Sequence, residues 1–389
     1  MRKLSMIALS LILLLTGCAP NFQKEEEVVQ ENEDTKKKAI IPKYQISDQF
    51  YRTLLPFEPS EARGLVVNNI NTRYDINEFE TGLMRMAQTA FDPENYLFQE
   101  GQYLERDEVR LWLNRQYTKE QLKENGLSDE ENIGLNPLDE GKGDIKERNE
   151  KNPIYLAHIL EHNYLKKDDD GTVRLKGVVI GLAMNSVHYY QKVQYGATFE
   201  KQIDHDAVER EGKKIAQEVI KRLRNKDDLK DVPITIALFE QEDRASVVPG
   251  NFFAYSKVDK GSNSINKWEK VEEEYFLFPS DDAKDKHRDD LTFFLNFKQD
   301  VEEYFPNFNG VIGKAFYVQG QLQELNISIP IQFYGKAEAV GFTQYVAGLV
   351  MEHFPEYITV QVEVSSVNGQ EALIVRKANQ DEPFVHIYN

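Results

Sequence analysis

Two histidines and a glutamate in the middle of the chain have a spacing that could do metal chemistry. The segment His158-Ile159-Leu160-Glu161-His162 fits the pattern His-x-x-Glu-His, which is known from zinc hydrolases. If the segment is helical, His158 and His162 share a face and could bind Zn²⁺ together, while Glu161 activates a water molecule. No third ligand follows Glu161 at a recognisable spacing, and the alternative is a helix without metal chemistry. We therefore expect no enzyme, no metal and no cofactor, and we keep a zinc hydrolase as the weakest hypothesis.

Cys18 is the other residue with a distinctive chemistry, and it is the only cysteine of the chain. Two cations open the sequence, a mostly apolar run follows (residues 6–15), and two small residues precede Cys18. A membrane-spanning helix needs about 20 apolar residues, so the run is too short to span and is typical of a secretory signal. The tetrapeptide Leu15-Thr16-Gly17-Cys18 resembles a bacterial lipobox, in which the peptide bond between Gly17 and Cys18 is cut and the thiol receives a diacylglyceryl group.

A lipidated Cys18 determines where the protein is expected to be. One acyl chain anchors only marginally, at ~0.8 kcal/mol per buried CH₂, whereas the two fatty acids of a diacylglyceryl group, such as palmitate, anchor stably. We therefore expect a lipoprotein at the cell membrane of a Gram-positive cell, anchored on the extracellular face. With no second cysteine, the chain forms no internal disulfide, and packing alone must stabilise it.

Composition indicates a large acidic protein with an ample core. The chain has 389 residues, of which 41% are hydrophobic and 11% aromatic, and this length predicts two or three domains. The formal net charge is −18, and removal of residues 1–17, with Arg2 and Lys3, gives −18 − 2 = −20. Such a charge is repelled by phosphate backbones, so we expect no nucleic-acid partner. The mature protein is expected to be monomeric.

The elements that must position these residues follow from periodicity and composition. The charged, aperiodic segment 18–40 predicts a disordered tether. In the region that follows, we expect a short strand at 63–67, a helix at 76–91 capped by Asp75, a helix at 106–116 and an exposed loop at 119–152.

The C-terminal half contains matching segments that predict an internal duplication. The helical stripe Ile215, Val219, Leu223 is matched 131 residues later, from Val346 to Phe354, and the alternating strand at 234–238 is matched at 358–362. The segments 177–180 and 310–313 also match, as do those around Phe253 and Phe384. Pro153–Leu165 and Leu291–Tyr304 each predict an opening helix.

These matches predict an α+β fold with two tandem α-β-β-α-β-β repeats and mainly antiparallel sheets. Repeats of this kind are architecture and imply no chemistry. The expected organisation is: signal peptide 1–17, lipidated tether 18–40, N-terminal α/β region and linker 41–150, repeat 1 at 151–260, linker 261–290, and repeat 2 at 291–389.

Three blocks of sequence carry a resemblance to a known family. They are 62–71 (Ala-Arg-Gly-Leu-Val-Val-Asn-Asn-Ile-Asn), 75–94, and 98–104 (Phe-Gln-Glu-Gly-Gln-Tyr-Leu). Together with the lipobox and the two-copy C-terminal half, they resemble the CamS-type sex pheromone (cAM373) precursor lipoproteins of Firmicutes. The resemblance implies that an apolar peptide before Cys18 is released and acts as a mating pheromone for plasmid-bearing enterococci. That peptide would be Leu11, Ile12, Leu13, Leu14, Leu15, Thr16 and Gly17.

Three hypotheses of different classes follow. The first is a non-enzymatic, membrane-anchored extracellular lipoprotein whose signal peptide yields a signalling peptide. The second is a module that binds an envelope peptide or glycan in a groove between the repeats, since aromatic residues are plentiful there. The third is the zinc hydrolase at His158, Glu161 and His162.

Overall fold

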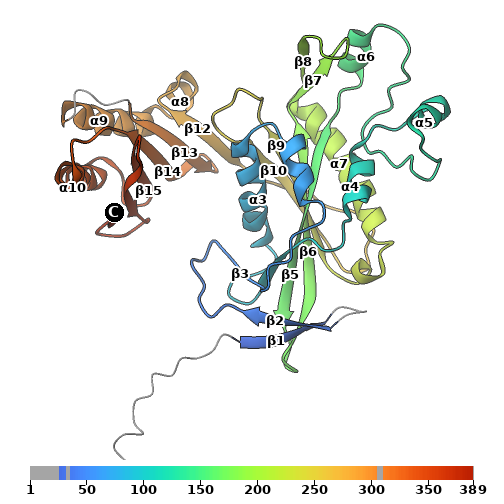
Figure 1. Cartoon of the computed structure of the whole chain (residues 1–389), viewed down its shortest axis with the longest axis horizontal. Coiled ribbons are helices and arrows are strands. Elements are labelled where there is room, and N and C mark those ends of the chain that lie inside the picture. Colours follow the sequence, from blue (N-terminus) through green and yellow to red (C-terminus); the bar gives the residue numbers. More distant parts are fainter. Residues whose placement is uncertain (1–25, 32–35, 305–309, 389) are drawn as a thin grey trace, which may run out of the picture.

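Two units, each built on its own β-sheet, make up the computed structural model, which describes residues 26–31, 36–304 and 310–388 (Figure 1). In the first unit the strands run in the order β11-β10-β9-β6-β5-β4-β3, and β1 pairs with both β2 and β6. In the second unit the order is β12-β13-β14-β15-β16-β17. A separate hairpin, β7 (Val187–Gln191) and β8 (Thr198–Gln202), projects from the first unit.

The strands of the two main sheets have these bounds: β1 Glu26–Glu31, β2 Lys36–Ile41, β3 Arg52–Thr53, β4 Leu97–Glu100, β5 Leu156–Lys167, β6 Thr172–Asn185, β9 Ile234–Gln241, β10 Asn251–Val258, β11 Glu269–Lys270, β12 Glu273–Phe278, β13 Ile312–Val318, β14 Gln321–Pro330, β15 Thr359–Ser366, β16 Gly369–Arg376 and β17 Phe384–Ile387.

The helices have these bounds: η1 Arg63–Leu65, α2 Val66–Asn69, α3 Arg73–Ala87, α4 Arg106–Leu113, α5 Lys119–Asn125, α6 Ile145–Lys151, α7 His205–Leu223, η2 Asp227–Leu229, α8 Asp281–Lys286, α9 Arg288–Tyr304 and α10 Lys336–His353. Among the residues described, none of these helices is both long and apolar enough to cross a membrane.

The first unit has three layers, because helices cover both faces of its sheet. Helix α3 buries Phe79, Leu83 and Met86 against one face, and α7 buries Ile215 and its apolar neighbours against the other. The central strands are therefore buried on both sides, as the unbroken burial of β6 from Gly177 to Met184 indicates.

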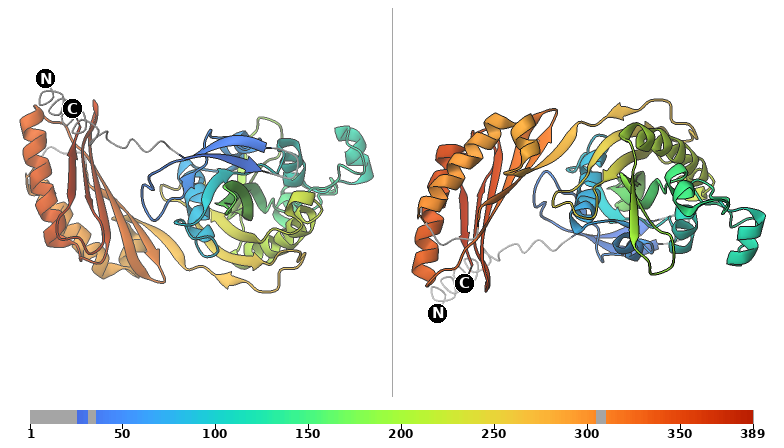
Figure 2. Two further views of the ribbon diagram at one scale, coloured as in Figure 1. Left: turned by 90° about the horizontal axis from the view of Figure 1, so that it is seen from below. Right: turned by 90° about the horizontal axis from the view of Figure 1, so that it is seen from above.

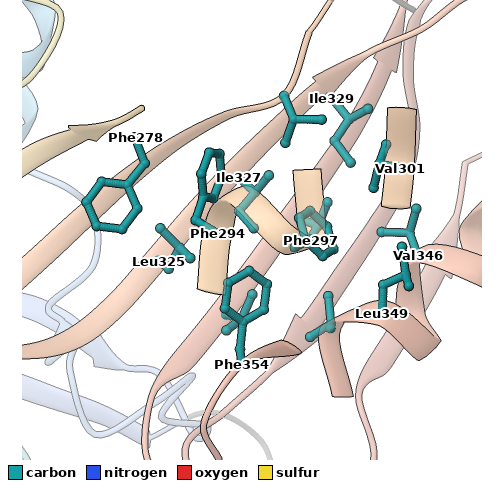
Figure 3. Close-up of a cluster of buried hydrophobic side chains, with 14 of the residues drawn as sticks. Phe278, Phe294, Phe297, Val301, Leu325, Ile327, Ile329, Val346, Leu349 and Phe354 are labelled. Atoms are coloured by element: carbon teal, nitrogen blue, oxygen red, sulfur yellow. The ribbon is translucent and has the colours of Figure 1, made fainter. Parts of the chain in front are cut away.

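The second unit has two layers, because its helices cover only one face of the sheet. Phe294 and Phe297 of α9 and Val346 of α10 pack on alternate residues of the strands, such as Leu325 and Ile327 (Figure 3). Both helices lie on the side away from the first unit, and the other face of the sheet is turned toward it (Figure 2). Residues on that face are only partly buried, as the alternating pattern of β15 indicates.

The α+β fold class is confirmed, but the expected repeat is not observed as such. Helices α7 and α10 each follow an antiparallel hairpin and lead to a strand, β9 or β15, that pairs in parallel with the second strand of a hairpin. The matched helical stripes and the matched strands at 234–238 and 358–362 therefore lie in equivalent elements. The segment 177–180, however, lies in β6, whereas the segment 310–313 enters the non-equivalent strand β13 at Ile312. Only the second unit has the expected opening helix, α9.

The helix expected at Pro153–Leu165 is wrong, because this segment forms strand β5. Nearly every residue of β5 from Leu156 to Leu165 is buried, since helices or loops cover both faces. A strand buried on both sides shows no alternation and cannot be told from a buried helix by periodicity.

Other expected elements also differ from the structure. The expected strand at 63–67 is η1 followed by α2, and the expected loop at 119–152 contains α5 and α6. The helix expected at 76–91 spans Arg73–Ala87, because the Thr72 hydroxyl accepts the Asp75 N–H at 3.0 Å and caps it. The helix expected at 106–116 is confirmed as α4.

The disordered tether expected at 18–40 is wrong for the part that the structure describes. Residues 26–31 and 36–41 form the hairpin β1–β2, and Val28 and Ala39 bury their side chains against Leu165. Ion pairs tie this hairpin to the sheet: Lys167 with Glu26, and Arg174 with Glu31 at 2.5 Å.

The expected domain boundaries also change. The boundary at 150/151 separates no units, because β3 and β4 belong to the same sheet as β5 and β6. The expected linker 261–290 contains β11, β12 and α8, and β12 is the edge strand of the second sheet.

Candidate functional site

The histidine motif lies on strand β5, so it does not have the geometry on which the zinc hypothesis depends. A strand rises ~3.3 Å per residue, which places the Cα atoms of His158 and His162 about 13 Å apart, too far to bind one ion together. Both face helix α3, and the His158 ring centroid lies 6.4 Å from that of Phe79. Glu161 points to the opposite face of the sheet. Within the described part of the chain, no three His, Cys, Asp or Glu side chains are grouped so that they could hold a metal ion.

Glu161 stabilises a loop. Its fully buried carboxylate accepts backbone N–H groups from Gln102 (3.0 Å), Tyr103 (3.2 Å) and Leu104 (2.7 Å). At Gly101 a Cβ atom would lie 2.5 Å from the Glu161 Cβ, so only glycine allows this approach. Burial raises the pKa of Glu161, although the three backbone hydrogen bonds oppose the shift. The carboxylate is occupied by the backbone and is not placed to activate water.

The two histidines are buried and uncharged at neutral pH. Their side chains are 1% and 2% exposed, and burial lowers the pKa of His158 to about 4 and that of His162 to about 3. The ring of His162 packs edge-on against Phe98, at 4.9 Å between centroids. The Nδ1 atoms of both histidines are buried without a hydrogen-bond partner. Buried polar atoms without partners are rare in folded proteins and call for an explanation.

A cavity of about 280 Å³ lies beside these histidines. Strand β4 pairs with β5 only over Leu97–Glu100 opposite His162–Leu165. The cavity is lined by β5 residues from His158 to His162, by helix α3 and by the chain before α2. We call this cavity the histidine pocket. Its lining residues are Thr53, Phe57, Ser60, Ala62, Arg63, Val66, Glu80, Met84, Phe98, Glu100, Leu104 and His158–His162.

Besides Glu161, whose carboxylate is held by backbone N–H groups, three charged side chains contribute to the histidine pocket. Arg63, half-exposed, pairs with Glu100, whose second oxygen accepts the backbone N–H of Ser60 at 2.8 Å. The Arg63 guanidinium also lies 5.7 Å from the ring centroid of Phe57. Glu80 of α3 is partly buried; burial raises its pKa, the Arg63 charge opposes this, and the Glu100 charge adds to it. Arg63 and Glu100 come from two of the three blocks that carried the family resemblance, and the fold brings them together.

A second hollow, of about 700 Å³, separates the bare face of the second sheet from the first unit. We call it the cleft. Leu277, Lys314, Asn326 and Gln361 are register partners on four neighbouring strands, so their side chains form one row across this face. Tyr74 of α3 lies on the opposite wall and is half-exposed. The groove expected between the repeats therefore has a counterpart, formed by one sheet face and the N-terminal unit.

Polar side chains in the cleft are held by each other. The Asn326 amide donates to Glu324 at 2.7 Å, and the Gln361 amide donates to Glu363 at 2.9 Å. Lys314 adds a cation to the same face. The cleft therefore presents amide, carboxylate and ammonium groups in fixed positions.

A buried ionic cluster joins the two units at one end of the cleft. Arg85 of α3 donates two hydrogen bonds to Glu273 of β12, at 2.8 and 2.7 Å, and one to Glu78 at 2.5 Å. The Tyr275 hydroxyl donates to Glu78 at 2.6 Å. Burial raises the pKa of Glu78, while the Arg85 charge opposes the shift. Glu78 and Arg85 lie in the block 75–94, but no sequence pattern paired them with Glu273 and Tyr275, nearly 200 positions later.

The lipidation residue Cys18, the cleavage site at Gly17 and the peptide Leu11–Gly17 lie outside the described residues.

Most of the chain is similar to one known protein family. The profile of the family described as CamS sex pheromone cAM373 precursor matches residues 57–382. The chain belongs to the CamS family. The resemblance noted in the sequence is thereby confirmed.

Two solved CamS-type structures are similar to this chain. The C-terminal domain of the sex pheromone staph-cAM373 precursor from Staphylococcus aureus is 34% identical, with a TM-score of 0.73, covering 82% of this chain and 98% of that one. The sex pheromone precursor from Lactobacillus salivarius is 32% identical, with a TM-score of 0.80, covering 89% of this chain and 98% of that one. None of the curated proteins compared with the chain matches it. The cleft, and all of the histidine pocket except Thr53, lie within the residues matched by the CamS profile.

Proposed function

We propose that this CamS-family chain is a non-enzymatic lipoprotein, anchored through Cys18 on the extracellular face of the cell membrane, whose cleft binds an envelope glycan. The observation that carries the binding role is the bare face of the second sheet. Its fixed polar side chains lie opposite the half-exposed Tyr74, and the cleft between them has a volume of about 700 Å³. The proposed anchor rests on the lipobox ending in Cys18.

Lipidation is tested by growth with radiolabelled palmitate. We expect label on the wild-type protein and none on Cys18→Ala, which should appear in the medium because no helix within the described residues is long and apolar enough to replace the anchor. A Cys18→Ala protein that stays fully membrane-bound would contradict the proposed anchor.

The chemistry of the cleft favours a glycan over a peptide. Peptides that add to sheets use the backbone groups of a free strand edge, whereas the cleft is lined by a sheet face. Side-chain amides can instead donate hydrogen bonds to sugar hydroxyl groups and accept hydrogen bonds from them, and carboxylates can accept them. The ring of Tyr74 offers an apolar surface. Glu324 and Glu363 outnumber Lys314, so a neutral glycan fits better than an anionic polymer.

The cleft is tested by calorimetry on the full chain in detergent micelles, with chitotetraose as the neutral glycan and a wall-derived stem peptide as its competitor. We expect saturable binding of the glycan, weakened at least tenfold in the double variant Asn326→Ala, Gln361→Ala. The matched control is Gln299→Ala, an exposed amide of α9 on the far side of the sheet. Binding of the peptide alone, or no change in the double variant, would refute the glycan assignment.

The family description supports a second role, release of the apolar peptide Leu11–Gly17 from the signal region. Its test is mass spectrometry of small apolar peptides in culture supernatant. A heptapeptide ion is expected from cells with the wild-type gene and should vanish when codons 11–17 are recoded. If no such ion accumulates, the protein is not a source of that peptide.

A further inference from the structure

The histidine pocket is a second site, separate from the cleft, and its lining points to a ligand. The Nδ1 atoms of His158 and His162 are buried, unpartnered and on the face of β5 that borders the cavity. An unsatisfied buried nitrogen is unfavourable by about 1–3 kcal/mol, so two in one cavity are a substantial defect unless a ligand completes their hydrogen bonding.

The charges around the pocket favour a cation. Arg63 is already paired with Glu100, while Glu80 makes no hydrogen bond to the described part of the chain. The formal charges of these three groups sum to −1, and the buried histidines add none because they are neutral at pH 7. The carboxylate of Glu161, on the other side of β5, is taken up by backbone N–H groups. Glu80 is thus the acceptor that an entering ammonium group would meet.

Apart from Thr53 and Ser60, the rest of the lining is apolar. Phe57, Met84, Phe98 and Leu104 contribute their side chains to the cavity. A volume of about 280 Å³ suits a molecule with a compact hydrocarbon body. A doubly charged or fully polar ligand would leave this surface poorly matched.

We propose that the histidine pocket binds a small organic cation, a primary ammonium group on an apolar body, with the ammonium on Glu80 and a neighbouring polar atom hydrogen-bonded to one of the two histidines. The amino-terminal residue of a short apolar peptide has this chemistry. The site stands independently of the cleft, since no residue lines both.

The test compares three probes that share the leucine side chain and differ in their charged groups: L-leucinamide, a cation, N-acetyl-L-leucinamide, which is neutral, and L-leucine, a zwitterion. They are added to the full chain in micelles at up to ~10 mM, which reaches ligands with a Kd of about 1 mM, and histidine ring signals are followed by NMR. Saturable shifts of the His158 and His162 signals are expected with leucinamide. The acetylated probe should bind at least tenfold more weakly because it lacks the ammonium group.

Variants of Glu80 test whether this carboxylate binds the ammonium group of the probe. Glu80→Gln should weaken leucinamide binding at least tenfold, whereas Glu61→Gln, an exposed carboxylate of the adjacent loop, should leave it unchanged. Thermal unfolding of Glu80→Gln checks that the fold is kept. The proposal is overturned if no probe gives saturable shifts, if leucine or the acetylated probe binds as well as leucinamide, or if Glu80→Gln binds like wild type.

Discussion

The buried histidines make stability depend on pH. Their pKa values in the folded protein, about 4 and about 3, lie below the ordinary value of 6.5, so the unfolded chain takes up protons first as pH falls. The stability that depends on the neutral histidines is therefore fully present above pH 6.5. As the pH falls toward 4, the free energy of unfolding decreases by about 1.4 kcal/mol per pH unit for each histidine.

We predict that His158→Gln loses part of this dependence. Between pH 6.5 and 4.5, the denaturation midpoint of wild type should fall more steeply than that of the variant, as measured by urea titrations at several pH values. His386→Gln, at an exposed position, should retain the wild-type slope. Equal slopes in all three proteins would mean that His158 is not held neutral by burial.

At the scale of residues, the sequence could show which groups were chemically capable but not their partners. The spacing of His158, Glu161 and His162 was visible, yet its meaning depended on helix or strand, which a doubly buried segment does not reveal. The partners of Glu161 are backbone N–H groups, and these have no sequence signal. Glu80 was also missed, because a carboxylate on a helix gives no sequence sign of the cavity beside it.

At the scale of elements, one buried arginine holds the end of α10. Arg376 of β16 is fully buried, and its guanidinium donates to the carbonyl oxygens of Phe354 (2.9 Å), Pro355 (2.5 Å) and Ile358 (3.4 Å). Helix ends leave carbonyl groups without intrahelical partners, and Arg376 satisfies those between α10 and β15. Arg224 does the same after α7, with the carbonyl oxygen of Val232 at 2.7 Å.

We predict that Arg376→Met lowers the free energy of unfolding by about 3 kcal/mol, because several buried carbonyl groups lose their donor. Guanidinium chloride denaturation measures the loss. Arg288→Met, an exposed arginine in the first turn of α9, should change stability by less than about 0.5 kcal/mol. A similar small effect for Arg376→Met would show that the carbonyl groups find other donors.

Elements with one buried face were predictable, and the others were not. Helix α7 and strand β15 expose one side, so their apolar residues recur at the helical or strand period. In α10 apolar residues lie on all sides, and only the buried ones, such as Phe342, Val346 and Leu349, follow the helical spacing. Strand β5 is covered on both sides, and the hairpin β1–β2 hides only a few apolar residues among many charges. The pairing of that hairpin with β6 is a long-range contact that local composition does not encode.

At the scale of the whole molecule, the cluster around Arg85 couples the two units. Removing one partner of a buried ion pair leaves an uncompensated charge, which typically destabilises by about 3–5 kcal/mol. In Arg85→Met, Glu78 and Glu273 would remain close together and buried.

We predict a strong coupling between Arg85→Met and Glu273→Gln in a double-mutant cycle, of at least about 1 kcal/mol, measured by chemical denaturation. Arg85→Met should also weaken glycan binding in the cleft, because the sheet face loses its fixed distance from α3. The pair Lys267 and Glu269, which is exposed on both sides, serves as control and should show little coupling. Additive effects at Arg85 and Glu273 would argue that the units are held elsewhere.

The arrangement of the two units could not be predicted from the sequence. Periodicity finds elements within each unit, but Arg85 and Glu273 meet across 188 positions. The expected boundary at 150/151 failed for the same reason, since the N-terminal strands join a sheet formed mostly by later residues.

The ordered hairpin at Glu26 has a consequence for where the protein could act. If Cys18 carries the lipid, the anchor lies only 26 − 18 = 8 positions before the first residue of the folded body. Even fully extended, eight residues span only about 28 Å. The folded protein would then stay within a thin layer next to the bilayer. A glycan or amine would have to diffuse into that layer to be bound. The rate at which the protein meets a ligand would then depend on the surface density of anchored protein in the membrane. Ligands held further from the bilayer would not be reached.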